Sequence, residues 1–225
     1  ADWFPANAAD RRPADSYDRQ HWFDAVGDEC RHVASHAGIL ELTGFSRFHV
    51  TGDGADEWLT TQITGNMPRV GHIGLAYFAS PKGKILSEMT VTRLAKNDFL
   101  LMTGAGAYWH DRDLLMASLP AGGPVTIIDV TRNLATLLVT GPKAPAILAD
   151  MTGQSMTHDD FAWLSHRKID LAGCQANVIR VSFAGEAGFE IHCQMDDVVA
   201  VYDAVMVAGA AHQLRPFGML ALDSM

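Results

Sequence analysis

The stretch that decides the fold is Arg180-Val181-Ser182-Phe183-Ala184-Gly185-Glu186-Ala187-Gly188-Phe189-Glu190-Ile191-His192. A strand-like run over residues 177–183 precedes two glycines, and a second such run begins at Phe189. Because glycine readily adopts the positive φ angles of tight turns, the pattern predicts a β-hairpin. Strand alternation places Glu190 on the face opposite Phe189 and Ile191. On a solvent face this carboxylate is an ordinary surface residue, whereas in a cleft it is a strong acceptor for a ligand with adjacent N–H groups. The pattern leaves both settings open.

Length and composition indicate an ordinary globular protein. The chain has 225 residues, of which 48% are hydrophobic and 19% charged, enough for one large or two modest domains. A net charge of −9 disfavours a general nucleic-acid surface. No apolar run reaches the roughly 18–20 residues that span a membrane, and no secretory signal is visible.

Three cysteines, Cys30, Cys174 and Cys193, are an odd number with wide spacing. They form neither a disulfide framework nor a metal motif, which favours buried structural thiols in a reducing, cytoplasmic compartment. Residues 1–20 are polar and interrupted by prolines, as is typical of an arm or linker remnant. Since the chain opens on Ala and stops in a helix-like segment, we expect it to be a piece of a longer polypeptide.

Hydrophobic periodicity predicts alternating helices and strands. The apolar spacing over residues 20–36 predicts an amphipathic helix that Gly38 ends. The turn at residues 80–84 is a strong hairpin signal between two strands. The predicted strands cover 39–50, 74–79, 85–94, 99–103, 125–130, 161–171 and 177–192 (the hairpin), and the further helices cover 55–63, a segment through 109–115, 196–208 and the chain end.

One unit occurs twice in the sequence. Val50-Thr51-Gly52 is followed by Ala55 and Leu59, and Val139-Thr140-Gly141 is followed at the same offsets by Ala144 and Leu148. A repeated strand, glycine turn and helix predicts a pseudo-symmetric α+β layer of the split βαβ type. We expect two discontinuous lobes within residues 21–225, one from residues 21–65 with 125–225 and the other from residues 66–124.

The common catalytic motifs are absent. There is no dinucleotide-binding glycine fingerprint, P-loop, zinc-protease helix or serine elbow. His32 and His36 share a helix face without a third ligand, which indicates surface residues. Glu88 is of more interest because neither face of its strand is cleanly polar. From the pattern alone an outward-facing residue is the favoured interpretation. The alternative is a strand covered on both sides, where a carboxylate needs a partner or a function.

Several short motifs, taken in order, carry a family resemblance: Trp22-Phe23 with Glu29-Cys30, residues 45–52, residues 83–92, Thr103-Gly104-Ala105-Gly106, Asp129-Val130-Thr131, residues 185–190 and Ala221-Leu222-Asp223-Ser224. From about Trp22 to its end the chain resembles the tetrahydrofolate-dependent aminomethyltransferases, the glycine cleavage T-protein and its relatives. Its nearest likeness is to the folate-binding portion of dimethylglycine and sarcosine dehydrogenases and oxidases. The resemblance implies an α+β folate-binding fold with ferredoxin-like split βαβ repeats, whose C-terminal β-barrel lobe would follow Met225 and is missing.

The resemblance also implies site residues. The family's pterin-binding carboxylate falls on Glu190, whose oxygens can accept parallel N–H bonds from a pterin. The acid near the reaction centre, usually Asp, falls on Glu88. Three cofactor-binding positions depart from the family: Phe183 stands where Tyr is common, Gly104 where Asn is found, and Leu222 where Arg is found. The last two departures favour the oxidase branch over a stand-alone T-protein, and they leave the folate tail fewer partners.

The implied reaction passes the carbon of an N-methyl amine to tetrahydrofolate. A flavin domain or subunit carrying FAD, outside this chain, would oxidise the amine to an iminium, and folate N5 and N10 would then take up the carbon as 5,10-methylenetetrahydrofolate. Glu88 would orient N10, stabilise the iminium charge or relay a proton. No nucleic-acid or membrane partner is implied.

Three alternatives stay open. The chain could be a T-protein fragment acting on a lipoyl-bound aminomethyl group, or a folate-dependent demethylase of the dimethylsulfoniopropionate type. It could also be a non-catalytic folate-binding protein serving iron–sulfur assembly. That last class typically carries a Lys-Gly-Cys-Tyr-type motif, whereas here Lys82-Gly83 is followed by Lys84-Ile85.

Overall fold

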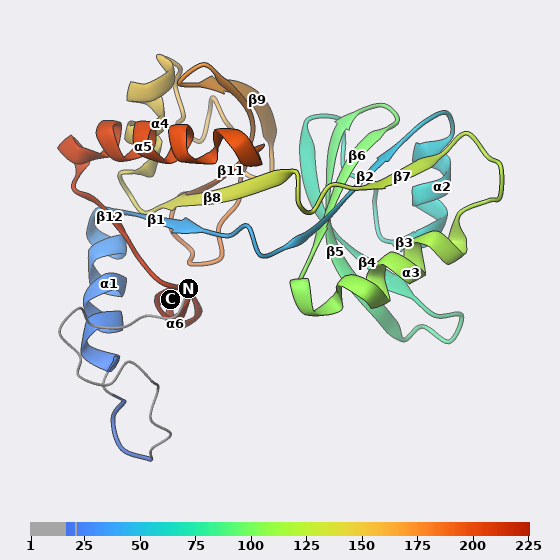
Figure 1. The fold of residues 1–225 in the computed structure, drawn as a ribbon, viewed down its shortest axis with the longest axis horizontal. Coiled ribbons are helices and arrows are strands. Elements are labelled where there is room, and N and C mark those ends of the chain that lie inside the picture. The colour runs from blue at the N-terminus through green and yellow to red at the C-terminus, as the bar shows by residue number, and fades with distance from the viewer. Residues whose placement is uncertain (1–16, 21) are drawn as a thin grey trace.

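Two β-sheets with flanking helices form the protein in a computed structural model that describes residues 17–20 and 22–225 (Figure 1). The first sheet has the strand order β12 (Leu214–Pro216), β1 (Ala37–Glu41), β8 (Leu134–Thr140), β11 (Gly188–Gln194), β10 (Cys174–Arg180), β9 (His166–Leu171). The second has the order β3 (Ile63–Thr64), β4 (His72–Ala79), β5 (Ile85–Ala95), β6 (Asp98–Thr103), β2 (Ser46–Thr51), β7 (Thr126–Asp129). The predicted α+β class is confirmed. Most of the predicted arm, residues 1–16, lies outside the described residues.

Helices cover both faces of the first sheet. On one face lie α4 (Ala144–Thr152) and α5 (Val198–Gly209), and on the other lie α1 (Phe23–Ser35) and α6 (Met219–Ser224) (Figure 1). The second sheet packs one face against α2 (Ala55–Gln62) and α3 (Tyr108–Ser118). Short 3-10 turns at Ala105–Ala107, Met195–Asp197 and Ala210–His212 adjoin α3 and α5. The other face of the second sheet is not covered by these helices, so it is the face that can contact the first sheet.

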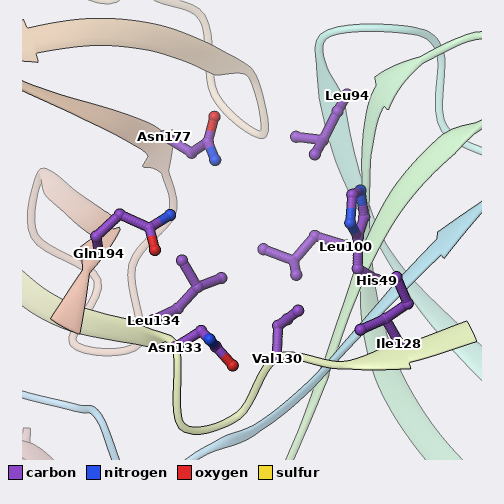
Figure 2. Close-up of a pocket in the computed structure, with 9 residues that line it drawn as sticks. All are labelled: His49, Leu94, Leu100, Ile128, Val130, Asn133, Leu134, Asn177 and Gln194. Carbon is purple, nitrogen blue, oxygen red and sulfur yellow. The ribbon is translucent and has the colours of Figure 1, made fainter.

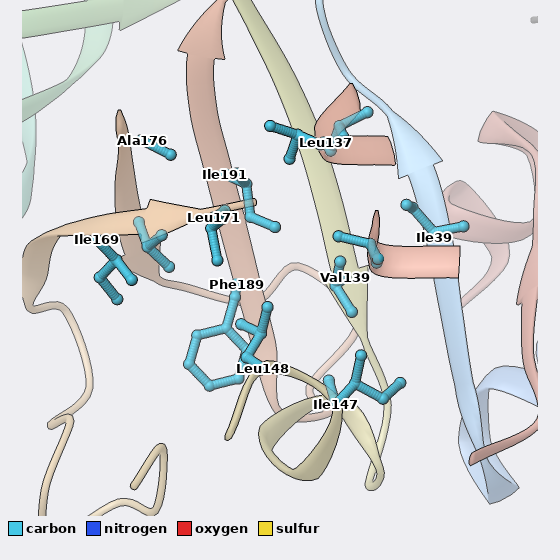
Figure 3. Close-up of a cluster of buried hydrophobic side chains, with 14 of the residues drawn as sticks. Ile39, Leu137, Val139, Ile147, Leu148, Ile169, Leu171, Ala176, Phe189 and Ile191 are labelled. Carbon is cyan, nitrogen blue, oxygen red and sulfur yellow. The ribbon is translucent and has the colours of Figure 1, made fainter. Parts of the chain in front are cut away.

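The main core lies between the first sheet and the α4–α5 layer. Phe189 and Ile191 of β11 pack there with Val139 of β8 and with Ile147 and Leu148 of α4 (Figure 3). Burying a side chain of this kind contributes about 1.5–3 kcal/mol relative to leaving it exposed. Alternation along β11 then directs Glu190 and His192 to the opposite face of the sheet.

The predicted repeat is found in space. Gly52 links β2 to α2 in the second sheet, and Gly141 links β8 to α4 in the first, with φ angles of +114° and +116°. The strand orders β7-β2-β6-β5 and β1-β8-β11-β10 correspond, which is the split βαβ arrangement. In the second sheet the fourth strand, β7, follows the other three in the sequence. In the first sheet the fourth strand, β1, precedes them.

The lobes exchange chain segments near residues 42–45 and 130–133. The sequence placed this division near residues 65 and 125, but strands β2 and β7 pair in the second sheet. For the same reason the single strand predicted over residues 39–50 is two strands, one in each sheet. Periodicity cannot detect this change, because it indicates which face of a strand is apolar and not which sheet the strand joins.

Two further predictions are wrong. Gly38 does not end α1 but lies within β1, where a Cβ would come 2.5 Å from the Phe217 ring and 2.7 Å from Val33. Glycine is therefore needed there for close packing. Of the strand predicted over residues 161–171, only His166–Leu171 is a strand.

The three cysteines are free, and only Cys193 is buried, whereas Cys30 and Cys174 are partly exposed. The expectation that all three thiols are buried is therefore correct for Cys193 and wrong for Cys30 and Cys174. Burial raises the pKa of Cys193 to about 11, with a smaller contribution from the negative charge of Asp197.

Replacing Gly141 with alanine is expected to lower the free energy of unfolding by about 3 kcal/mol or more. The new Cβ would lie 2.7 Å from the carbonyl oxygens of Val33 and His36, at a φ of +116°. Gly153→Ala is the matched control, because its φ is also positive but its Cβ would meet nothing within 4 Å; there we expect about 1 kcal/mol. Urea unfolding followed by circular dichroism measures both losses, and equal losses would contradict the close-approach argument.

Cys193 of the native chain is expected to alkylate at pH 8 about a hundredfold more slowly than free cysteine, because the thiolate is the reactive form and a raised pKa depletes it. Mass spectrometry after a timed iodoacetamide pulse measures the rate, with Cys174 as the partly exposed internal reference. Equal labelling of the two residues in the native chain is the contrary result.

Candidate functional site

The predicted hairpin is confirmed between β10 and β11, which pair in antiparallel fashion with Ile179 opposite Glu190. The connecting turn spans residues 181–187, and its two glycines have different roles. Gly185 has a positive φ of +78°, as expected for a turn. Gly188 lies instead where a Cβ would come 2.5 Å from the Val181 carbonyl oxygen. The second glycine is thus required by a close backbone approach.

Glu190 is buried, with only 3% of its surface exposed. Nε2 of His192 lies 3.1 Å from its Oε2 atom. Among the described residues, no side chain or backbone group forms a hydrogen bond with its Oε1 atom. Of the two settings that the sequence left open, the solvent face is excluded. The carboxylate therefore has one oxygen engaged and one oxygen available.

A chain of hydrogen bonds connects Glu190 with the second sheet. Arg47 of β2 is fully buried, and its Nη2 atom donates to Oγ1 of Thr136 at 2.6 Å. Thr136 Oγ1 in turn lies 2.9 Å from Nδ1 of His192. Burial lowers the pKa of Arg47, and the negative charges of Glu190 and Glu41 oppose that shift. The two sheets therefore meet at a buried guanidinium that acts electrostatically on the carboxylate.

Glu88 lies on the face of the second sheet that carries Arg47. Thr90 of β5 pairs with Met102 of β6, and Met102 pairs with Arg47 of β2, so these three side chains share a face of the sheet. Glu88 precedes Thr90 by two residues and therefore lies on that same face. Continuing this register places Glu88 across from Gly104. Glu88 is exposed, so of the two settings that the sequence left open it has the outward-facing one that the pattern favoured. No hydrogen bond or ion pair joins Glu88 to Glu190 among the described residues.

A cavity of about 350 Å³ lies where the two lobes meet, and neither Glu190 nor Glu88 is among its lining residues. Its lining comes from both lobes and from α6: Glu41, Leu42, Gly44, Phe45, Gly104, Ala105 and Met219. Gly104 therefore lies at a cavity, as a cofactor-contacting position should. Leu222, three residues after Met219, packs instead in the apolar cluster of α1 and α6. Phe183 is 72% exposed in the β10–β11 turn.

A second cavity of about 350 Å³ is lined by residues of both sheets. Figure 2 shows the amides of Asn133, Asn177 and Gln194 on one side of it and Leu100 and His49 on the other. On β2, His49 lies two residues beyond Arg47 on the same face of the strand, and it lines this second cavity.

Sequence reasoning did not find Arg47, Thr136 or His192. A usable signal existed for Arg47, which stands between Ser46 and Phe48 in an aromatic strand, just as Glu190 stands between Phe189 and Ile191. A charged residue in an apolar strand deserves the same question in both places. Thr136 and His192 carry no comparable signal, because a hydroxyl or an imidazole in a strand is common.

Within residues 17–20 and 22–225, no cluster of three or more His, Cys, Asp or Glu side chains could hold a metal ion. In the same part of the chain, no helix has the length and apolar character needed to cross a membrane.

Comparisons with known proteins agree with this architecture. The family of the GCVT N-terminal domain matches residues 1–225. Human mitochondrial dimethylglycine dehydrogenase is 30% identical over 99% of this chain and 26% of that protein. The Bacillus subtilis aminomethyltransferase is 27% identical over 90% of this chain and 56% of that protein. The chain therefore spans about a quarter to a half of these relatives.

Solved structures share the fold. The glycine cleavage system aminomethyltransferase T from Bartonella henselae superposes with a TM-score of 0.75 at 24% identity, over 88% of this chain and 52% of that one. A chain of heterotetrameric sarcosine oxidase from Corynebacterium sp. U-96 gives 0.63 at 16% identity, over 88% and 97%. With a family match over its full length and two sheets in the expected arrangement, the chain belongs to the GCVT N-terminal domain family, the aminomethyltransferase family of the glycine cleavage T-protein.

Proposed function

We propose that this chain binds a reduced folate and serves the transfer of a one-carbon unit from an N-methyl amine to tetrahydrofolate. The single observation that carries the proposal is the Glu190 carboxylate, which is buried at the junction of the two lobes with Oε1 unpartnered among the described residues. Oε1 is not among the described side-chain atoms that are fully buried without a partner, so it is open to solvent or to a ligand. A ligand with adjacent N–H groups can therefore donate to this oxygen.

The residues present fit a pterin edge. A carboxylate accepts two parallel N–H bonds from a planar donor pair, and Oε2 retains a free lone pair beside the bond from His192. The neighbouring cavity with Gly104 in its wall supports a binding site that reaches both lobes. The folate, when bound, supplies the amine nitrogens that take up the carbon and carry it as 5,10-methylenetetrahydrofolate.

Glu88 is the proposed acid beside the chemistry. Its exposed position on the Arg47-bearing face of the second sheet lets its carboxylate reach a ligand held between the lobes. There it would orient a folate nitrogen, stabilise cationic charge or relay a proton. Electrostatic stabilisation by a fixed carboxylate contributes a few kcal/mol to such a step. Phe183 and Leu222 stay proposed folate contacts from the family resemblance; Phe183 is exposed in the hairpin turn, and Leu222 packs with α1 and α6.

The oxidase branch is the proposed context, with a flavin domain or subunit supplying the oxidised amine. It is supported by the similarity to dimethylglycine dehydrogenase and by a sarcosine oxidase chain that this fold covers almost entirely. A T-protein fragment is the second candidate, favoured by the similarity to an aminomethyltransferase. A cytoplasmic site of action stays a prediction; the human relative is named as mitochondrial.

Glu190→Gln is expected to weaken binding of 5-formyltetrahydrofolate by about tenfold or more, because the amide offers one acceptor where the carboxylate offered two. Isothermal titration calorimetry on the chain measures the dissociation constant. Glu186→Gln, in the turn of the same hairpin and only partly buried, is the control and should bind normally. Wild-type protein that binds no reduced folate, or a Glu190→Gln variant as tight as wild type, would refute the anchor.

Glu88→Gln is expected to lower formation of 5,10-methylenetetrahydrofolate by about a hundredfold while folate affinity stays near wild type, since charge and not contact is removed. The assay supplies an N-methyl amine with its flavin oxidase and measures the folate product by chromatography. Glu57→Gln, an exposed carboxylate on α2, is the matched control. Unchanged turnover in Glu88→Gln would remove that residue from the mechanism.

A further inference from the structure

We propose that His192 is a positioning residue for Glu190: its protonated Nε2 holds Oε2 of the carboxylate and so directs Oε1 to the ligand. The positioning role rests on the proposed function, because it requires a ligand at Glu190. The arrangement of the protons is a property of the free protein and does not depend on that ligand. Both side chains are buried, with 1% of His192 and 4% of Glu190 exposed. Solvent therefore has little access to the bond between them.

The donors and acceptors of the network determine where the protons lie. A guanidinium only donates, so Thr136 Oγ1 accepts from Arg47 Nη2 at 2.6 Å. The Thr136 hydroxyl has one hydrogen of its own, and Nδ1 of His192 is the partner at 2.9 Å. Nδ1 is then an acceptor, and the ring proton is on Nε2, which faces Oε2 of Glu190 at 3.1 Å. In this arrangement the Thr136 hydroxyl and the His192 ring N–H both have acceptors, whereas Nε of Arg47 has none among the described residues in either arrangement.

The opposite arrangement leaves a buried donor unsatisfied. If Nδ1 carried a proton, Thr136 Oγ1 would accept from both Arg47 and His192, and its own hydrogen would point at no acceptor among the described residues. An unpaired buried donor is costly. A lone proton on Nδ1 would also place the Nε2 lone pair against the Glu190 carboxylate.

Nothing else on the sheet can take over this role. In the neighbouring strands Glu190 lies opposite Leu138 and Ile179, which are apolar. His166 on β9 is the next imidazole on this face, but its Nε2 is engaged with Oδ1 of Asn177 at 3.0 Å. Because Arg47 belongs to the second sheet, the position of the carboxylate in the first sheet depends on how the two lobes pack.

The free protein tests the proton arrangement directly. Long-range ¹⁵N–¹H correlation spectra of the labelled chain, with His192→Gln used to assign the signals, should show Nε2 of His192 protonated and Nδ1 unprotonated at neutral pH. A ring protonated on Nδ1, alone or together with Nε2, would overturn the inference. This result does not depend on whether the chain binds folate.

Affinity variants test the positioning role. His192→Gln retains an N–H group near the Nε2 position and should bind 5-formyltetrahydrofolate within about threefold of wild type, whereas His192→Phe should bind about tenfold more weakly. Thr136→Ser keeps the hydroxyl and should resemble wild type, and Thr136→Val should weaken binding. His49→Gln, at the other cavity, is the control.

The outcomes separate the two proposals. If wild type binds and Glu190→Gln does not, but both His192→Phe and Thr136→Val bind as wild type, the folate site stands and the positioning role is overturned. If His192→Phe does not fold, the Thr136 pair and the ¹⁵N spectra decide. If wild type binds no folate, the proposed function is lost, and the spectra alone judge the hydrogen-bond arrangement.

Discussion

The buried guanidinium of Arg47 is the constraint on which the junction of the two lobes depends. Its side chain donates to the carbonyl oxygens of Leu42, Thr43 and Phe45, in the first segment that crosses between the sheets, and to Thr136 in the first sheet. Its backbone N–H donates to Oγ1 of Thr131, in the second crossing segment. Burying a charge is expensive unless its donors are satisfied. The Nη1 and Nη2 groups of this guanidinium find their acceptors only when the first crossing segment and the first sheet are in place together, whereas Nε has no partner among the described residues.

Around that junction the fold uses one unit twice. Each lobe builds a split βαβ sheet from a strand, a glycine with a φ near +115° and a helix whose first alanine is fully buried. Ala55 and Ala144 both donate their backbone N–H to the glycine oxygen at 3.0 Å. The lobes differ in where the fourth strand originates, and this difference makes the chain cross twice between them. The crossing segments are therefore a consequence of completing both sheets.

The same junction accounts for the candidate site. Glu190 comes from the first sheet, Glu88 comes from the second, and Gly104, which follows β6 of the second sheet, lines one of the cavities. A carboxylate held in an apolar sheet is a stronger acceptor than one in water, because the surroundings screen its charge less. The architecture thus suits a ligand that binds both lobes and is anchored by its N–H groups, as a pterin is.

The sequence by itself determined the β10–β11 hairpin and the repeated strand, glycine turn and helix, and it singled out Glu88 and Glu190 as candidate site residues. It could do so because strand alternation, glycine turns and family motifs are local properties of the chain. Only the tertiary structure decided which sheet each strand joins, why Gly38 and Gly188 must be glycine, and that Glu190 is buried while Glu88 is exposed. It alone revealed Arg47, Thr136 and His192 as one chain of hydrogen bonds. The two hydrogen bonds that join them span 89 and 56 positions of the sequence, and no local pattern reports contacts over such separations.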